Sequence, residues 1–321
     1  MNRIKNKLFK ILFLEWLLCL SLPAIAQDNN ILQPIAEIER RLKFEPFEIF
    51  RFRDSRFEGD ITKRAILKCP DGIYIQCKWK RAAKGGYANN NEPRYEIAAY
   101  ELQKLFLDPD DYVVPPTVGR SLPLGQYLTI EPYVEPTFKN TSSVFFVLQY
   151  WLEEVSADNI LDKKRFKADS TYARHLGDMN ILSYLIEHKD SNIGNFLIST
   201  DPDNPRVFVV DNSLAFSSPK SDRGYEWKKI RVKRLPAKTI DRLRKIQKAD
   251  LERTLGVVAN YEIKNGQLIP ATAAANLDEN KGVRRSETVI QFGLTANEIE
   301  RVYDRLQNLL KRVDSGKIKT F

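Results

Sequence analysis

The sequence predicts an α+β fold in two parts, a smaller strand-rich part with one helix and then a larger helical part. Residues 64–82 read as two strands joined by a turn at Pro70-Asp71-Gly72, and residues 94–106 then repeat apolar side chains at helical spacing. Further along, helical spacing predominates, at 142–156, 172–188, 237–255 and 295–313. In the last of these segments, Thr295 and Glu298 are placed as a capping box.

The first 26 residues have the layout of a secretory signal peptide. A basic start precedes an apolar run, and Ala24-Ile25-Ala26 provides a small-residue cleavage site. We therefore expect cleavage after Ala26 and a periplasmic or secreted protein without a stable membrane span. Because Glu15 interrupts the apolar run, an uncleaved anchor remains the alternative.

The net charge of the chain indicates which kinds of ligand it can bind. The formal net charge is +9, and removal of residues 1–26 leaves 51 − 4 = 47 basic and 42 − 1 = 41 acidic residues, or +6. This mild excess suits an anionic ligand such as a phosphate and argues against a nucleic-acid partner.

Two cysteines, Cys69 and Cys77, remain after cleavage of the signal peptide. They can form a disulfide or stay as two free thiols on the strands, and the free thiols are favoured.

The predicted organisation places a connector between the two parts. Residues 31–44 are expected to form a short amphipathic helix, and apolar runs cut by prolines at 112–120 and 125–136 suit short strands and a connector near 131–136. The expected units are a signal peptide, an N-terminal helical extension, a small lobe and a large lobe, at 1–26, 27–55, 56–131 and 132–321.

A cluster of acidic and amide residues begins in the second part. Asp190 follows His188 by two residues and precedes Asn195 by five, which is the H-x-D-x-x-x-x-N spacing of a kinase catalytic loop. Asp211 follows the apolar strand 207–210. This pattern predicts Asp190 as a catalytic base and Asn195 and Asp211 as oxygen ligands of Mg²⁺ or Mn²⁺. Turn formation alone is the competing interpretation of all three, and His188 is expected to support the loop structurally.

Phosphoryl transfer also requires a cation on the phosphates. Lys78 and Lys80 lie on one face of the second predicted strand, and Glu96 lies in the first turns of the next helix. A lysine–glutamate pair between these elements is what a kinase uses to hold the phosphates. Either lysine can fill the role, with Lys78 preferred, and an exposed strand edge is the competing interpretation. There is no G-x-G-x-x-G loop before the hairpin.

Several segments resemble the atypical secretory-pathway kinases, the family of the Golgi casein kinase, xylosylkinase and four-jointed kinase, and more distantly the spore-coat kinases. The resemblance covers residues 56–255 in patches and rests on "RYEIAAYELQKLF", "VVPPTVGR", "MNILSYLIEHKDSNIGNF" and "VVDNSLAF". It implies a two-lobed protein-kinase-like fold, with Glu96 near the lysine or the metal. It also implies that Glu131, Tyr133 and Val134, in "IEPYV", face the nucleotide. "DNSLAF" departs from the usual D-F-G pattern.

The function expected from these features is a kinase-like phosphotransferase. It uses ATP or another nucleoside triphosphate with Mn²⁺ or Mg²⁺, and its acceptor is a hydroxyl of a protein or glycan in the envelope or outside the cell. Two alternatives share the fold. One is a pseudokinase acting as a binding module in the envelope, and the other is a nucleotidyl transferase. The sequence identifies neither the nucleotide nor the acceptor.

Overall fold

The computed structural model describes residues 28–321 except 55–60, 89–90, 191, 217–223 and 273. The predicted signal peptide therefore lies outside the described residues. The helix predicted at 31–44 is present as α2 (Ile35–Phe44), and the hairpin predicted at 64–82 is present as β2 (Thr62–Lys68) and β3 (Tyr74–Arg81).

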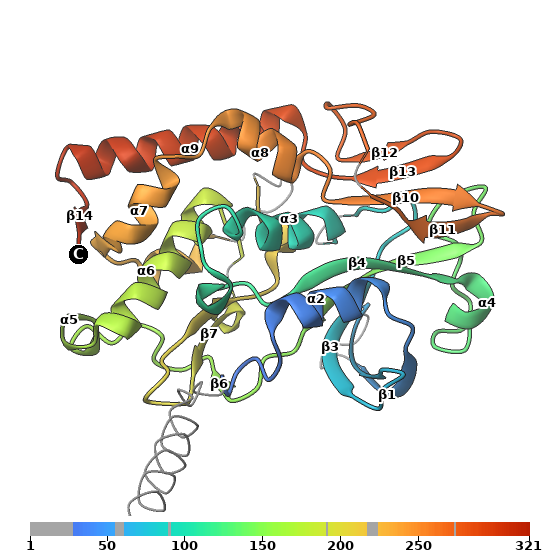
Figure 1. Ribbon diagram of the computed structural model, residues 1–321, viewed down its shortest axis with the longest axis horizontal. Coiled ribbons are helices and arrows are strands. Elements are labelled where there is room, and N and C mark those ends of the chain that lie inside the picture. Colours follow the sequence, from blue (N-terminus) through green and yellow to red (C-terminus); the bar gives the residue numbers. More distant parts are fainter. Residues whose placement is uncertain (1–27, 55–60, 89–90, 191, 217–223, 273) are drawn as a thin grey trace, which may run out of the picture.

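A five-stranded antiparallel sheet forms the first part of the fold. Its order is β1-β2-β3-β5-β4, with β1 at Glu48–Asp54, β4 at Thr117–Pro123 and β5 at Ser143–Tyr150. The helix predicted at 94–106 is α3 (Pro93–Gln103), which crosses above β4 and β5 (Figure 1). The short elements η1 (Pro109–Asp111) and α4 (Leu124–Tyr127) flank β4 in the chain.

Two predictions for this region are wrong. Residues 142–156 were expected to be helical, but they contain β5, whose eight residues are all buried between β3 and β4. A strand covered on both faces has an uninterrupted apolar run, so its sequence lacks the alternation that identifies a half-exposed strand. The lobe boundary predicted after residue 131 is also wrong, because the sheet includes β5 and begins with β1, inside the predicted helical extension.

The second part is mainly helical, as predicted. It contains the long helices α6 (Ser170–Leu185) and α9 (Ala296–Asp314), and α9 has the predicted capping box. The segment predicted as one helix at 237–255 forms two, α7 (Ala237–Leu243) and α8 (Lys248–Leu255). The short elements are α5 (Arg165–Ala168), η2 (Ile193–Asn195), η3 (Asn212–Leu214), η4 (Glu226–Ile230), and β9 (Arg234–Leu235) paired with β14 (Lys319–Thr320).

Two smaller sheets complete the fold. The predicted strands at 196–199 and 207–210 are present as β7 (Phe196–Ser199) and β8 (Val207–Val209), and β6 (Val155–Ser156) joins them. A four-stranded sheet that we did not predict has the order β11-β10-β13-β12, from β10 (Ala259–Lys264), β11 (Gln267–Pro270), β12 (Val283–Arg285) and β13 (Val289–Phe292).

Helix α3 belongs to both parts. Tyr95, Ala98 and Leu102 lie in one apolar core with side chains of α6, α8 and α9. The four-stranded sheet packs on the larger sheet through Phe292, whose ring stacks on Phe145 at 4.2 Å. The helix that carries Glu96 is thus enclosed between the two parts, as Figure 1 shows.

The two cysteines are free and buried. Cys77 lies opposite Ala65 in the register of β2 and β3, and burial raises the pKa of its thiol. Of the two possibilities left by the sequence, the structure therefore has the free thiols.

Candidate active site

Three side chains from separate elements meet beside a cleft. Lys78 is on β3, Glu96 is in the first turn of α3, and Asp211 follows β8. The ammonium group of Lys78 donates to Oε1 of Glu96 at 3.2 Å and to Oδ1 of Asp211 at 3.1 Å. The structure therefore brings together one of the two candidate lysines and both carboxylates.

The second candidate lysine lies within reach of the same two carboxylates. The ammonium nitrogen of Lys80 is 3.7 Å from Glu96 and 3.5 Å from Asp211, and it donates to Oγ of Ser213 at 3.0 Å. Lys80 is only 7% exposed. Lys78, in contrast, lines the cleft together with Asp211. Both lysines thus belong to one charge cluster, and Lys78 is the one that faces the cleft.

The backbone around Asp211 explains how its carboxylate reaches the lysines. Asp211 has a φ of 58°, in the left-handed region that aspartate tolerates better than most residues. The next residue, Asn212, is fully buried, and its backbone N–H donates to Oε2 of Glu96 at 2.9 Å. Glu96 therefore bonds to β3 through one oxygen and to the turn after β8 through the other.

The charge states of the cluster follow from these contacts. Burial opposes the charged form of Lys78, but the nearby Asp211 and Glu96 carboxylates outweigh it and raise the lysine pKa. Burial likewise opposes ionisation of Asp211, but the charges of Lys78 and Lys80 outweigh it and lower the pKa of that carboxyl. Two cations therefore face two carboxylates. Because neither exposed nor buried ion pairs add much to stability, ligand binding is the better explanation for a cluster in which the Asp211 side chain is 41% exposed at the cleft.

The loop before β7 holds the other predicted residues. Asp190 is buried, and its Oδ1 accepts the backbone N–H of Asn192 at 3.0 Å. Asn195 lies at the end of η2 and lines the same cleft as Lys78 and Asp211. The backbone carbonyl of Asn195 accepts from Val210, the neighbour of Asp211, at 2.9 Å. This bond fixes the loop beside the aspartate turn.

His188 is a packing residue of that loop. It is 1% exposed, and its ring lies 5.2 Å from the ring of Phe196. Burial lowers the pKa of His188, which keeps its imidazole neutral. The environment agrees with the structural role expected for this histidine.

The cleft has a volume of about 580 Å³. Besides Lys78, Asp211 and Asn195, its lining comes from Gly194, Leu197 and Val210 and from a segment that begins with the last two residues of β5. The contributing residues of that segment are Gln149, Tyr150, Trp151, Leu152, Glu153, Glu154 and Val155. A volume of this size suits a nucleotide.

The segment predicted to face the nucleotide lies elsewhere. Glu131 pairs with Arg81 at 2.9 Å, Tyr133 is 97% exposed, and neither they nor Val134 belong to the described cleft lining. These three residues therefore lie outside the cleft of Lys78 and Asp211, and their contact with a nucleotide stays a prediction. Because residues 142–156 were predicted to be a helix, the connector was expected before this segment and not at the end of β5.

The donor atoms fit a hard divalent cation. Asp211 provides a carboxylate and Asn195 an amide at the cleft, although among the described residues no three His, Cys, Asp or Glu side chains form a preassembled metal site. Mg²⁺ and Mn²⁺ in phosphotransferases are commonly held by one or two carboxylates with substrate phosphates and water. Asp211 and Asn195 would therefore be the protein ligands of such a cation.

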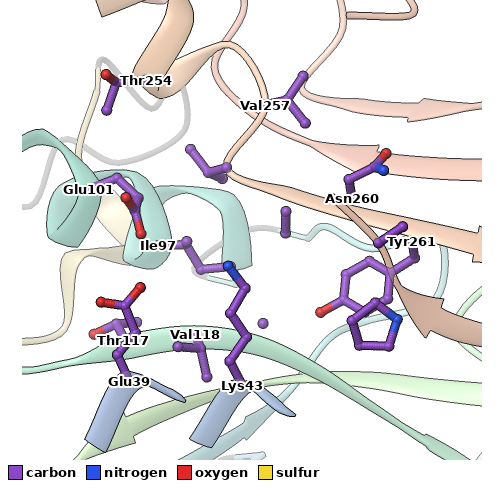
Figure 2. A pocket seen from close by; sticks show the side chains of 15 residues that line it. Glu39, Lys43, Ile97, Glu101, Thr117, Val118, Thr254, Val257, Asn260 and Tyr261 are labelled. Atoms are coloured by element: carbon purple, nitrogen blue, oxygen red, sulfur yellow. The ribbon is translucent and has the colours of Figure 1, made fainter. Parts of the chain in front are cut away.

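A second cavity lies on the other side of α3, away from these residues. Its volume is about 180 Å³. Figure 2 shows Ile97 and Glu101 of α3 on one side, Tyr261 on the other and Lys43 between them. This cavity belongs to the packing of α3 and not to the charge cluster around Asp211.

Solved structures show the same fold. A hydra Fam20 structure determined with a sugar aligns over 87% of this chain and 89% of its own, with 16% identity and a TM-score of 0.53. The Golgi casein kinase aligns over 87% and 75% of the two chains, with 15% identity and a TM-score of 0.51. Its Mn/ADP-bound structure gives a TM-score of 0.50. No family model matches the chain, and no curated protein matches it.

The chain therefore has the two-lobed fold of kinase-like proteins. In particular, the chain has the fold of Fam20 and the Golgi casein kinase, so the resemblance to the atypical secretory-pathway kinases is confirmed for the fold. Within the described part of the chain, no helix is both long and apolar enough to cross a membrane.

Proposed function

We propose that the protein is a metal-dependent phosphotransferase that moves the γ-phosphoryl group of a nucleoside triphosphate to a hydroxyl group of a protein or glycan. The observation that carries this proposal is the contact of Lys78 with both Glu96 and Asp211 at the edge of a nucleotide-sized cleft. Phosphoryl transfer depends mainly on positioning and on charge stabilisation, and these are the groups that provide both.

Each residue has a defined role in this proposal. Lys78 binds the phosphates, and Glu96 holds that lysine in place. Asp211 and Asn195 hold Mn²⁺ or Mg²⁺, which supplies positive charge against the phosphate oxygens. The nucleobase lies between the segment after β5 and Leu197.

Asp190 is the proposed base. Its Oδ1 is held by the Asn192 amide, and its backbone carbonyl accepts from Glu226 at 3.4 Å, so both ends of the residue are fixed. In this position, the carboxylate orients the acceptor hydroxyl and takes its proton as the oxygen attacks phosphorus. The bond between the γ-phosphorus and the bridging oxygen breaks, the nucleoside diphosphate leaves, and the acceptor becomes a phosphate ester.

The proposed place of action is outside the cytoplasm. Residues 1–26 have the composition of an export signal, and one neighbour in fold is a Golgi enzyme. We therefore place the acceptor in the cell envelope or outside the cell.

The test is transfer of label from γ-labelled ATP to an envelope extract in the presence of Mn²⁺. We expect the wild type to label an acceptor and Asp190→Ala and Asp211→Ala to lose this activity. Label carried from α-labelled ATP instead would indicate nucleotidyl transfer. Nucleotide binding without any transfer would indicate a pseudokinase, and equal labelling by all three proteins would exclude the proposed site.

A further inference from the structure

The first turn of α3 is held from two opposite directions. Successive residues of an α-helix are about 100° apart around the axis, so Arg94 and Glu96 point to nearly opposite sides. Glu96 points to the lysines of β3. Arg94 and its neighbour Tyr95 instead bind Glu298 in the first turn of α9, 204 residues further along the chain.

These three residues form what we call the Arg94–Glu298 clasp, consisting of Arg94, Tyr95 and Glu298. The guanidinium group of Arg94 donates to both carboxylate oxygens of Glu298, at 2.5 and 2.9 Å. The Tyr95 hydroxyl donates to Oε1 of Glu298 at 2.5 Å. This two-point pairing fixes an orientation as well as a distance, unlike a single ion pair.

The acceptor side of the clasp is itself fixed. Glu298 is the third residue of α9, and its Oε2 also accepts the backbone N–H of Thr295 at 2.8 Å in the capping box. Burial opposes ionisation of Glu298, but the bonds from Arg94 outweigh it and lower the pKa of this carboxyl. The carboxylate is therefore both charged and held by the end of a helix.

The donor side is enclosed. Arg94 is 8% exposed, and a Cβ atom added to Gly282 would lie 2.4 Å from its guanidinium carbon. Arg94 also donates to the backbone carbonyl of Gly293 at 3.3 Å. The side chain thus passes through a gap that only glycine leaves open.

Apolar packing also holds α3, since ten of its eleven residues are buried. No side chain caps its N-terminus at Glu92, and the cavity of Figure 2 lies behind Ile97 and Glu101, so packing on this face is incomplete. At the far end, Lys104 bonds to Glu39 at 2.9 Å. The clasp is therefore a polar restraint next to Glu96 that is separate from the contacts of Glu96 itself with Lys78 and the Asn212 amide.

We propose that the Arg94–Glu298 clasp is the positioning device of the candidate active site. It fixes the rotation of α3 from the large-lobe side and thereby keeps Glu96 against Lys78 and the Asn212 amide. Arg94, Tyr95 and Glu298 touch neither the cleft nor its charged residues, so they act through Glu96. The inference concerns the placement of Glu96 and rests on the proposed function only for its effect on nucleotide binding.

The Asn212 amide gives a direct readout, because its N–H donates a hydrogen bond to Oε2 of Glu96. Glu298→Gln keeps a cap acceptor for Thr295 but removes the charge, and Tyr95→Phe removes only one hydroxyl. Lys104→Met is the matched control, since it breaks ion pairs of the same helix at its other end. Amide hydrogen exchange of the segment containing Asn212 is then compared among these variants without any nucleotide.

We expect exchange at Asn212 to accelerate about tenfold in Glu298→Gln, less in Tyr95→Phe and not in Lys104→Met. Unchanged exchange in both clasp variants would overturn the inference, as would equal acceleration in the Lys104 control, which would indicate general loosening. If Glu298→Gln does not fold, Tyr95→Phe decides the outcome in the same way.

A second measurement separates this inference from the proposed function. Titration with ADP and Mn²⁺ is expected to give weaker binding in the clasp variants than in Lys104→Met. If the wild type binds no Mn²⁺–ADP, the proposed function fails, while the exchange data still decide whether the clasp positions Glu96.

Discussion

Lys78 and Asp211 are 133 residues apart in the sequence, yet the ammonium group of one lies 3.1 Å from the carboxylate of the other. Lys78 is on the sheet of the first part, and Asp211 follows a strand of the second. The contact therefore joins the two parts of the fold beside the cleft. A metal-bound nucleotide would meet both charges there, because a lysine and an aspartate are the groups that hold its phosphates and its cation.

The two lysines are expected to differ in their effect on nucleotide binding. Lys78→Met is predicted to weaken Mn²⁺–ADP binding more than tenfold, since it removes the cation that faces the cleft. Lys80→Met is predicted to weaken it less, since Lys80 bonds to Ser213 in the aspartate turn. Calorimetric titration of both variants is the measurement. A larger loss in Lys80→Met would reverse the assignment of the phosphate ligand.

Asp190 is expected to act in the chemical step and not in nucleotide binding. Asp190→Asn keeps an oxygen to accept the Asn192 amide but removes the base, so turnover should fall by about 10²–10⁴-fold. Affinity for Mn²⁺–ADP should stay within about twofold of the wild type. A twofold change in affinity is far smaller than the tenfold change that corresponds to about 1.4 kcal/mol. Initial-rate and binding measurements on the same preparation test both statements. Retained turnover would remove Asp190 from the mechanism.

The position of the nucleobase can be tested by comparing Leu197, which lines the cleft, with Tyr133, which lies in the connector predicted from the sequence. Leu197→Ala is predicted to weaken ADP binding about tenfold, because it removes apolar contact worth about 1–2 kcal/mol from the cleft. Tyr133→Ala is the control, since that side chain is 97% exposed outside the described cleft lining. A loss of affinity in Tyr133→Ala alone would restore the connector predicted from the sequence.

Asp178 is expected to make stability depend on pH. It is 1% exposed in α6, and burial raises its pKa from an ordinary value of 3.8 to about 7, despite the hydrogen bond from Thr239. The folded protein keeps this proton when the unfolded chain has lost it. The stabilisation is therefore present at low pH and is lost as pH rises toward 7.

Chemical denaturation at pH 5 and pH 8 measures this effect. Between these values, the free energy of unfolding of the wild type should fall by about 3 kcal/mol more than that of Asp178→Asn, which does not titrate. Equal changes in the two proteins would show that Asp178 titrates normally in the fold.

Local sequence patterns predicted most of the helices and the position of the loop that carries Asp190 and Asn195. The hairpin turn at Asp71-Gly72, the helix carrying Glu96 and the capping box at Thr295 all appear as predicted. These features depend on residues close together in the chain, where turn, cap and periodicity rules apply. The sequence spacing also placed Asp190 and Asn195 on one loop before β7.

Features that depend on distant contacts were missed. The apolar run of β5 has no alternation, because β3 and β4 flank it and both of its faces are covered. The strands β10–β13 are short, and their apolar residues are explained only by their packing against Phe145 of the larger sheet. The pairing of Arg94 with Glu298 spans 204 residues, and no local rule signals it.

We propose above all that Asp211 and Asn195 hold a divalent cation against the phosphates of a nucleotide, and that Lys78 binds the same phosphates. The most direct measurement is the affinity for ADP with and without Mn²⁺ in the wild type and in Asp211→Asn. We predict that Mn²⁺ strengthens ADP binding by at least about tenfold in the wild type and has little effect in the variant. Equal affinity with and without the metal in the wild type, or the same metal response in both proteins, would contradict the account.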